Sequence, residues 1–362
     1  MNQRCVSRRI CIPTYNFCIA GLGNVGTALI TLLLRKRQLL AEQYKVEWRI
    51  TGVASRRLGW LAAPNGFTPE KLLAGDFSEA GDSGSGLSGS DVSGRNTCAD
   101  VRGWLALGRA DVLFETTSLN AATGQPAIDH LRAALEMGAH AITANKGPVV
   151  YGYRELTALA AEKGRRFLFE SSVMDGVPIF SLFREGMPTV EVLGFRGVLN
   201  STTNVILDGM ESGMSFDDSL RRAQELGVAE SDPTDDIKGV DAAVKVVALC
   251  NVLMGTELKP SDVQRQGIRG ITAAQLREAR SSGGAWKLVA SATRQADGRV
   301  VATVQPERLK LSDPLAQVNG TSSVISFATD ILPQLIITEQ DPGLETTAYG
   351  LLADFLTAVR SR

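Results

Sequence analysis

The stretch Phe17–Gly26, FCIAGLGNVG, decides the fold class of this chain. Its first four residues are apolar and suit a short strand, and a helical pattern follows to about residue 40. A strand, a turn with GxGxxG spacing and a helix together form the phosphate-binding unit of dinucleotide folds. Gly21 allows the tight turn, Gly23 lets a pyrophosphate approach the backbone, and Gly26 lets the helix pack on the strand.

The alternative interpretation of this stretch is a glycine-rich connection that binds no ligand. The flanking strand and helix favour the ligand-binding interpretation. The first turn of the helix, with Asn24 and Val25, offers backbone amides and partial positive charge to phosphates. Further strands are expected at residues 46–54, 111–115, 139–143 and 166–170, and helices at 124–137 and 149–163. The alternation predicts an α/β fold with a Rossmann-type, doubly wound parallel sheet.

The pattern changes after residue 170. Strands of a mainly antiparallel sheet are expected at residues 190–199, 285–305 and 322–338, and helices at 215–226, 237–254 and 344–359. We therefore expect a second, α+β domain. The dinucleotide-binding domain is expected at residues 1–150, with the C-terminal helix in 341–362 packing back on it, and the substrate-binding domain at 151–340.

Composition excludes several classes of protein. The 362 residues suit two domains, and 21% charged with 44% hydrophobic residues is typical of soluble globular chains. A formal net charge of −1 argues against nucleic acid and anionic membranes, and no apolar run is long enough to span a bilayer. Five cysteines without CxxC spacing argue against a disulfide framework and a zinc site, and favour a cytoplasmic protein.

The residues after the second strand bear on the choice of dinucleotide. An NAD-specific site usually has an acidic residue there, over the adenosine ribose. This chain has Ser55, Arg56 and Arg57 instead. A hydroxyl and two guanidinium groups suit a 2′-phosphate, so we favour NADP and keep NAD open. The alternative is that both arginines only face solvent.

Two other strands end in polar residues. Thr116 and Thr117 follow the strand at 111–115, and Lys146 follows the strand at 139–143. Ligands in open α/β sheets bind beyond the carboxyl ends of the strands, which places these residues on the nicotinamide side. A lysine there can contact substrate or cofactor. The alternative is an exposed lysine at a helix start.

The stretch 229–249, AESDPTDDIKGVDAAVKVVAL, is the richest in chemistry. It gathers Glu230, Asp236 and Asp241, and its helical pattern places Asp241 and Lys245 four residues apart on one face. A carboxylate fixed beside an amine can bind a small amino acid and move a proton. The alternative is an acidic helix start with a solvent-facing ion pair.

The segment 75–96 is crowded with glycine and serine. It carries too little apolar surface to pack against the rest of the chain. We expect a mobile surface loop.

Several blocks of sequence together carry a family resemblance. They are GLGNVG (21–26), ITANKGP (142–148), FESSVMDGVPI (169–179), GVLNSTTNVIL (197–207), AQELGVAESDPTDDIKGVDAAVK (223–245) and DPGLETTAYGLLAD (341–354). The first block is generic to dinucleotide folds. The 197–207 and 223–245 blocks are specific, and with them the chain resembles homoserine dehydrogenases from end to end.

This resemblance implies an NAD(P)-dependent interconversion of L-homoserine and L-aspartate 4-semialdehyde, on the route to threonine and methionine. Lys245 matches the proton-donating lysine of the family, and Asp241 matches its catalytic aspartate. Residues at substrate-contacting positions are Glu230, Asp236, Thr202 and Lys146. Lys146 also matches the lysine near nicotinamide, and Gly343 falls where the C-terminal glycine of the family approaches the cofactor.

The resemblance also implies a cation and a partner. Main-chain carbonyls at positions matching Glu170, Val173, Asp175 and Val177 hold a sodium ion in the family, so the identity of those side chains matters little. A homodimer formed through the β-rich region is implied, which makes residues 151–340 a dimerisation domain as well. Longer members carry a regulatory ACT domain or a fused kinase, and we expect neither here.

Two rival functions remain. An aspartate-semialdehyde dehydrogenase shares the metabolite but needs a nucleophilic cysteine, whereas Cys18 lies in an expected strand and Cys250 in an apolar helix. A protein that binds the dinucleotide without catalysis is the other rival. The Asp241–Lys245 pair argues against it, and tight NADPH binding without turnover would support it.

Overall fold

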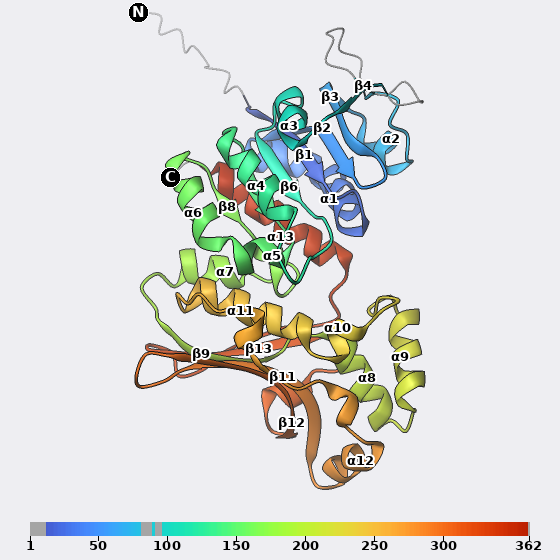
Figure 1. The fold of residues 1–362 in the computed structure, drawn as a ribbon, viewed down its shortest axis with the longest axis vertical. Coiled ribbons are helices and arrows are strands. Elements are labelled where there is room, and N and C mark those ends of the chain that lie inside the picture. Colours follow the sequence, from blue (N-terminus) through green and yellow to red (C-terminus); the bar gives the residue numbers. More distant parts are fainter. Residues whose placement is uncertain (1–11, 81–88, 91–95, 361–362) are drawn as a thin grey trace, which may run out of the picture.

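The chain forms two β-sheets with helices packed on and between them (Figure 1). The structure, a computed structural model, describes residues 12–80, 89–90 and 96–360. The expected mobile loop at 75–96 falls mostly outside the described residues. Within the described residues, no helix combines the length and the apolar character needed to cross a membrane.

The first sheet has eight strands in the order β4-β5-β3-β2-β1-β6-β7-β8. Its strands are β1 (Thr14–Ala20), β2 (Glu47–Ser55), β3 (Gly59–Phe67), β4 (Gly89–Ser90), β5 (Asn96–Cys98), β6 (Val112–Glu115), β7 (His140–Thr143) and β8 (Phe167–Leu168). The five strands from β2 to β8 in this order are parallel, which confirms the expected Rossmann-type core. The other edge is antiparallel, because β2 turns back directly into β3.

Helices cover both faces of this sheet (Figure 1). They are α1 (Asn24–Leu39), α2 (Pro69–Leu73), α3 (Val101–Leu107), α4 (Ala127–Glu136), α5 (Lys146–Tyr151) and α6 (Tyr153–Glu162). Helix α1 continues into one π-helical turn, Leu40–Tyr44. The single helix expected at 149–163 is instead two helices that meet at Gly152, whose backbone leaves the helical region (φ −125°, ψ 3°).

The second sheet has six strands in the order β10-β12-β11-β9-β13-β14. They are β9 (Val192–Val198), β10 (Gln264–Arg265), β11 (Gly284–Arg294), β12 (Val300–Lys310), β13 (Ser323–Thr329) and β14 (Leu335–Glu339). All neighbours pair antiparallel except β10 with β12. The expected antiparallel sheet is thus confirmed.

Helices of the second half lie mainly between its sheet and the first half (Figure 1). They are α7 (Ile179–Ser181), α8 (Ser201–Glu211), α9 (Phe216–Glu225), α10 (Thr234–Ile237), α11 (Val240–Leu253), α12 (Ala273–Ser281) and α13 (Leu344–Val359). Nine of the fourteen residues of α11 are buried, so it is a central element of the core. The last helix, α13, returns to the first half and packs beside α1 over its sheet.

Candidate active site

The glycine turn after β1 has the geometry that phosphate binding requires. Gly21 has φ +101°, and a Cβ on it would lie 2.5 Å from the Thr116 backbone. A Cβ on Gly26 would lie 2.4 Å from the Gly21 carbonyl oxygen, so helix and turn are in close contact. A Cβ on Gly23 would meet nothing within 4 Å, and no side chain caps the first turn of α1. The turn therefore presents open space and uncapped amides at Asn24 and Val25.

A cavity of about 500 Å³ opens beside this turn. Ser55 and Arg56, at the β2–β3 connection, line it together with Gly21, Trp60 and His130. Arg57 is exposed and does not line the cavity. The structure thus brings two of the three residues expected to select the dinucleotide to one pocket. Trp60 and His130, which sequence reasoning missed, meet edge to face with ring centroids 5.2 Å apart.

A second, smaller cavity of about 230 Å³ is lined both by residues of the expected dinucleotide site and by residues of the expected catalytic site. One side of it is formed by Val25, Thr116 and Thr117, which follow strands of the first sheet. Lys146, at the start of α5, and Lys245, on α11, also line it. The residues expected near nicotinamide and those expected to move the proton therefore share one space.

Two lysines flank one carboxylate here. Lys146 Nζ lies 3.2 Å from Asp241 Oδ1, and Lys245 Nζ lies 3.5 Å from Asp241 Oδ2. Lys245 Nζ also donates to the Leu199 carbonyl oxygen at 2.5 Å. The three side chains are 16–21% exposed, so the pairs are largely shielded from solvent. The predicted pair of Asp241 and Lys245 is present, and Lys146 adds a second cation from a distant part of the chain.

Asn200 ties this cluster to a further acid. Its amide nitrogen donates to Asp236 Oδ1 at 2.7 Å and to Asp241 Oδ2 at 3.1 Å. Its side-chain oxygen accepts from the Thr203 backbone amide at 2.9 Å and so caps the start of α8. The Asn-Ser-Thr-Thr pattern is a helix-start signal, but its bridging role depends on the tertiary fold.

The charges of the cluster support one another. Burial raises the pKa of Asp241, but the cations of Lys146 and Lys245 and the Asn200 amide together hold that pKa well below its usual range. The charge of Asp241 in turn raises the pKa of Lys146. Burial and the charge of Asp241 raise the pKa of Asp236. At neutral pH Asp241 is ionised and Lys146 is a cation.

The other expected substrate contacts are only partly assembled. Thr202 is buried in the first turn of α8, and its hydroxyl donates to the Val228 carbonyl oxygen at 2.9 Å. Glu230 is exposed, and its backbone carbonyl accepts a hydrogen bond from the Gln224 side chain. Over the described chain, no hydrogen bond or ion pair joins the Glu230 carboxylate to Asp241 or Lys245.

The expected sodium ligands lie on one short loop after β8. Residues Glu170 to Ser172 form a single 3₁₀ turn, and Asp175 follows with φ +42°. The Val177 carbonyl accepts from the Ile179 amide at 2.8 Å. Val173 and Asp175 line the smaller cavity, so the loop borders the site.

Gly343 lies at the N-terminal end of α13, and a Cβ on it would meet nothing within 4 Å. It lines neither of the two cavities. Its expected contact with the cofactor stays a prediction.

Comparisons with known proteins agree across the whole chain. A family model described as "Homoserine dehydrogenase, NAD binding domain" matches residues 21–170. A second, described as "Homoserine dehydrogenase", matches residues 178–356. The chain is 33% identical over 342 residues to an NAD(+)-dependent homoserine dehydrogenase of Pseudomonas canavaninivorans, covering 94% of this chain and 95% of that one. It is also 33% identical to a homoserine dehydrogenase of Methanocaldococcus jannaschii, covering 93% and 96%.

Solved structures give the same result. A putative homoserine dehydrogenase from Archaeoglobus fulgidus superposes with a TM-score of 0.80 at 28% identity, covering 95% of this chain and 98% of that one. A hyperthermophilic archaeal homoserine dehydrogenase mutant in complex with NADPH superposes with a TM-score of 0.76 at 27% identity, covering 95% and 97%. The chain belongs to the homoserine dehydrogenase family.

Proposed function

We propose that this protein interconverts L-homoserine and L-aspartate 4-semialdehyde with a nicotinamide dinucleotide. The observation that carries the proposal is the cavity in which Thr116 and Thr117 meet Lys146 and Lys245, with Asp241 between the two lysines. The enzyme would serve the route to threonine and methionine. Initial rates of homoserine oxidation test it, and a protein that binds dinucleotide without turnover would refute it.

The dinucleotide would supply or accept the hydride, and the chain supplies position and charge. In the reductive direction Lys245 donates a proton to the forming alkoxide, directly or through one water. The Leu199 carbonyl and Asp241 hold the Lys245 ammonium in place. Lys146 adds positive potential near the reacting oxygen. In the oxidative direction Lys245 accepts the proton.

The polar ends of the substrate would bind around the start of α8. Asp236 and Glu230 bind the α-ammonium, and Thr202 with nearby backbone amides takes the α-carboxylate. Asn200 holds Asp236 toward the cluster, which supports this role. For Glu230 the supporting observation is weaker, because its carboxylate is exposed, and a movement of the 228–233 segment has to bring it in.

NADP is the proposed dinucleotide, and Arg56 with Ser55 supports it by lining the larger cavity. NAD is the competing choice, and the names of the relatives include both an NAD(+)-dependent enzyme and an NADPH complex. Rates with NADP⁺ and NAD⁺ at equal concentration decide between them. A higher kcat/KM for NAD⁺ would contradict the assignment.

A sodium ion is proposed beside this site, held by backbone carbonyls of Glu170, Val173, Asp175 and Val177. The turn-rich course of the loop and its place at the cavity fit a hard cation with oxygen ligands. The ion would order the loop rather than enter the reaction. Assays with and without added Na⁺ or K⁺ test this, and equal rates in both would refute it.

A thioester mechanism finds no support in the cysteines that the structure describes. Burial raises the pKa of Cys18 and of Cys250 to about 12, and burial also raises the pKa of Cys98. None of the three lines the two cavities. Since the thiolate is the nucleophile, these residues are poorly suited to attack an aldehyde. Cys5 and Cys11 lie outside the described residues.

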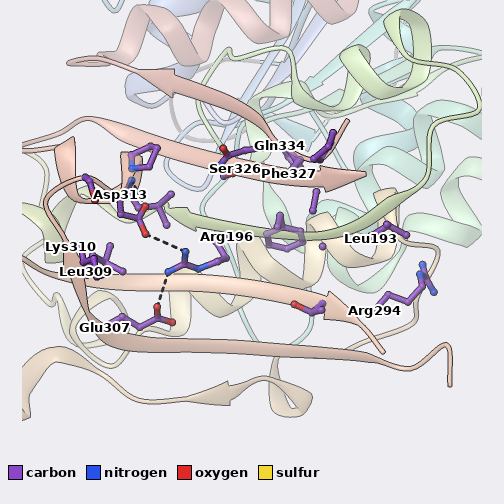
Figure 2. Close-up of a pocket in the computed structure, with 18 of the residues that line it drawn as sticks. Leu193, Arg196, Arg294, Glu307, Leu309, Lys310, Asp313, Ser326, Phe327 and Gln334 are labelled. Atoms are coloured by element: carbon purple, nitrogen blue, oxygen red, sulfur yellow. Dashed lines mark hydrogen bonds and ion pairs between the residues drawn. The ribbon is translucent and has the colours of Figure 1, made fainter. Parts of the chain in front are cut away.

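We also propose a cytoplasmic homodimer formed through the second sheet, within a substrate-binding and dimerisation domain at 151–340. Figure 2 shows the groove of about 890 Å³ that crosses one face of this sheet. Arg196 lines it, with one guanidinium nitrogen 2.9 Å from Glu307 Oε2 and the other 3.3 Å from Asp313 Oδ2. Leu193 also lines it and is 38% exposed. A sheet face with a central ion pair and exposed apolar residues suits a second copy. Sedimentation of the wild-type chain and of Leu193→Asp tests this, with a shift to monomer expected.

A further inference from the structure

One buried carboxylate that interacts electrostatically with Asp175 and Lys245 belongs to none of the predicted roles. Glu339 is the last residue of β14 and is only 8% exposed. In the part of the chain that the structure describes, its Oε2 atom is buried and has no hydrogen-bond partner. Leaving a buried acceptor without a donor is unfavourable, because the desolvation of that group is not compensated. Such an atom calls for a donor that the protein itself does not provide.

Strand pairing and one hydrogen bond connect Glu339 to the start of α8. Glu339 pairs across to Ser323 on β13. Two residues before Ser323, the Thr321 carbonyl accepts from the hydroxyl of Ser201 at 3.1 Å, which attaches this edge to the first turn of α8. The residues that precede α8 include Leu199, whose carbonyl holds Lys245. The carboxylate thus lies on an element fixed to the proposed binding region for the substrate's polar ends.

In the described residues no ion pair joins Glu339 to a cation, although the charge of Lys245 acts on it. Burial and the nearby carboxylate of Asp175 raise the pKa of Glu339 and the charge of Lys245 lowers it, with a net pKa of about 7. Lys245 is already engaged with Asp241 and the Leu199 carbonyl. Asp175 accepts a hydrogen bond from the Thr347 hydroxyl at 2.5 Å, and its charge raises the pKa of Lys146. A positively charged group of a ligand would satisfy the free oxygen and reduce the repulsion between the two acids.

We infer that Glu339 accepts a hydrogen bond from the α-ammonium of the substrate and selects an amino acid over a simple alcohol. The inference rests on the proposed function. An ammonium group has three donors. Asp236 accepts one of them in the proposed pose, while the Glu230 carboxylate is exposed outside the cluster. Glu339 is a buried acceptor whose Oε2 atom has no donor among the described residues.

The test compares two substrates that differ only in the amine. Homoserine and 4-hydroxybutanoate share the alcohol, the chain and the carboxylate. In Glu339→Gln, kcat/KM for homoserine should fall about 10-fold or more, since hydrogen bonds to charged groups contribute about 1.5–3 kcal/mol. The value for 4-hydroxybutanoate should stay the same or rise. Where it is not turned over, its competitive inhibition constant against homoserine replaces kcat/KM.

A matched control removes the same charge from the surface. Glu257, exposed and ion-paired with Arg154, becomes glutamine in Glu257→Gln and should leave both substrates unaffected. Thermal melting and NADPH binding confirm that each variant is folded. Equal losses for both substrates in Glu339→Gln would overturn the inference, and so would no loss for either. A changed Na⁺ or K⁺ requirement with unchanged discrimination would also overturn it. Absence of homoserine turnover in the wild type would refute the proposed function instead.

Discussion

Two pairs of cations were expected at the dinucleotide and substrate sites, and their surroundings differ. Lys146 and Lys245 are mostly buried and share the carboxylate of Asp241. Arg56 and Arg57 are exposed at the β2–β3 connection, and the described residues place no carboxylate within ion-pair distance of either. A cation that is ion-paired with a carboxylate keeps one geometry. A cation without an ion pair can bind an anionic group of a ligand.

The difference separates two tasks. Catalysis gains when charged groups are already oriented before the reaction begins, so that little reorganisation is needed. Discrimination between two dinucleotides needs only a difference in affinity, which an exposed arginine can supply through a charge-assisted hydrogen bond. The buried pair should therefore act mainly on turnover, and the exposed pair mainly on the choice of dinucleotide.

The largest effect should follow Lys245→Ala. The change removes the proposed proton donor, so kcat should fall about 10²–10⁴-fold, the usual contribution of a positioned acid. Initial rates of homoserine oxidation measure it. NADPH binding, followed by fluorescence, should be nearly unchanged, because Lys245 is not among the proposed dinucleotide contacts. Near-normal turnover would show that Lys245 is not the proton donor.

Sequence reasoning found the parts of this site that depend on local spacing. The GxGxxG turn and the four-residue separation of Asp241 and Lys245 are visible in the chain itself. The Lys146–Asp241 pair is not visible in this way. It forms because α5 packs beside α11, and a contact between residues 95 positions apart has no local signal.

Strand β3 shows a different failure. Its sequence Gly-Trp-Leu-Ala-Ala-Pro-Asn-Gly-Phe contains the residues of a turn, and no strand was expected there. In the structure Ile50 pairs with Phe67, and Gly52 pairs with Ala62. The residues between Ala62 and Phe67 therefore bulge out of the pairing, with Gly66 at φ +97°. Turn residues inside a bulge leave the strand intact on either side of it.

Glu339 was missed for a third reason. Single acidic residues at strand ends are common and usually face solvent. The burial of this carboxylate depends on the pairing of β13 with β14, which has no local signal in the sequence. In the folded chain Asp175 and Lys245 act on its pKa. The acids of the 229–249 stretch were predicted to belong to the site because they are clustered in the sequence. Glu230 is one of them, and it is exposed.

A smaller effect should follow the double change Arg56→Ala, Arg57→Ala. Loss of the guanidinium groups should lower kcat/KM for NADP⁺ about 10-fold, the effect of one hydrogen bond to a charged group. The value for NAD⁺, which has no 2′-phosphate, should change little. Steady-state rates with each dinucleotide measure both values. Arg56→Ala should account for most of the loss, since Arg56 lines the cavity and Arg57 does not. Equal losses with both dinucleotides would show that the exposed pair does not discriminate.

The smallest effect concerns thermal stability at low pH. It tests whether Lys146 and Lys245 hold Asp241 in its ionised form. Because the folded-state pKa of Asp241 is depressed, its ionised form stabilises the fold above the unfolded pKa of about 3.9. That stability is lost as pH falls through the folded pKa. The advantage in Tm of the wild type over Asp241→Asn should therefore shrink by about 2 °C or more between pH 6 and pH 3.

Asp236→Asn provides the comparison for this measurement. Burial and the charge of Asp241 raise the folded-state pKa of Asp236, so its ionised form destabilises the fold, and protonation removes that cost as pH falls. The Tm of the wild type relative to Asp236→Asn should therefore rise with acidification, opposite in sign to the Asp241 result. Thermal melts of the three proteins at matched ionic strength measure both differences. If the two variants shifted in the same direction, Asp241 would not be held ionised by the two lysines, and the contrast with the exposed arginines would fail.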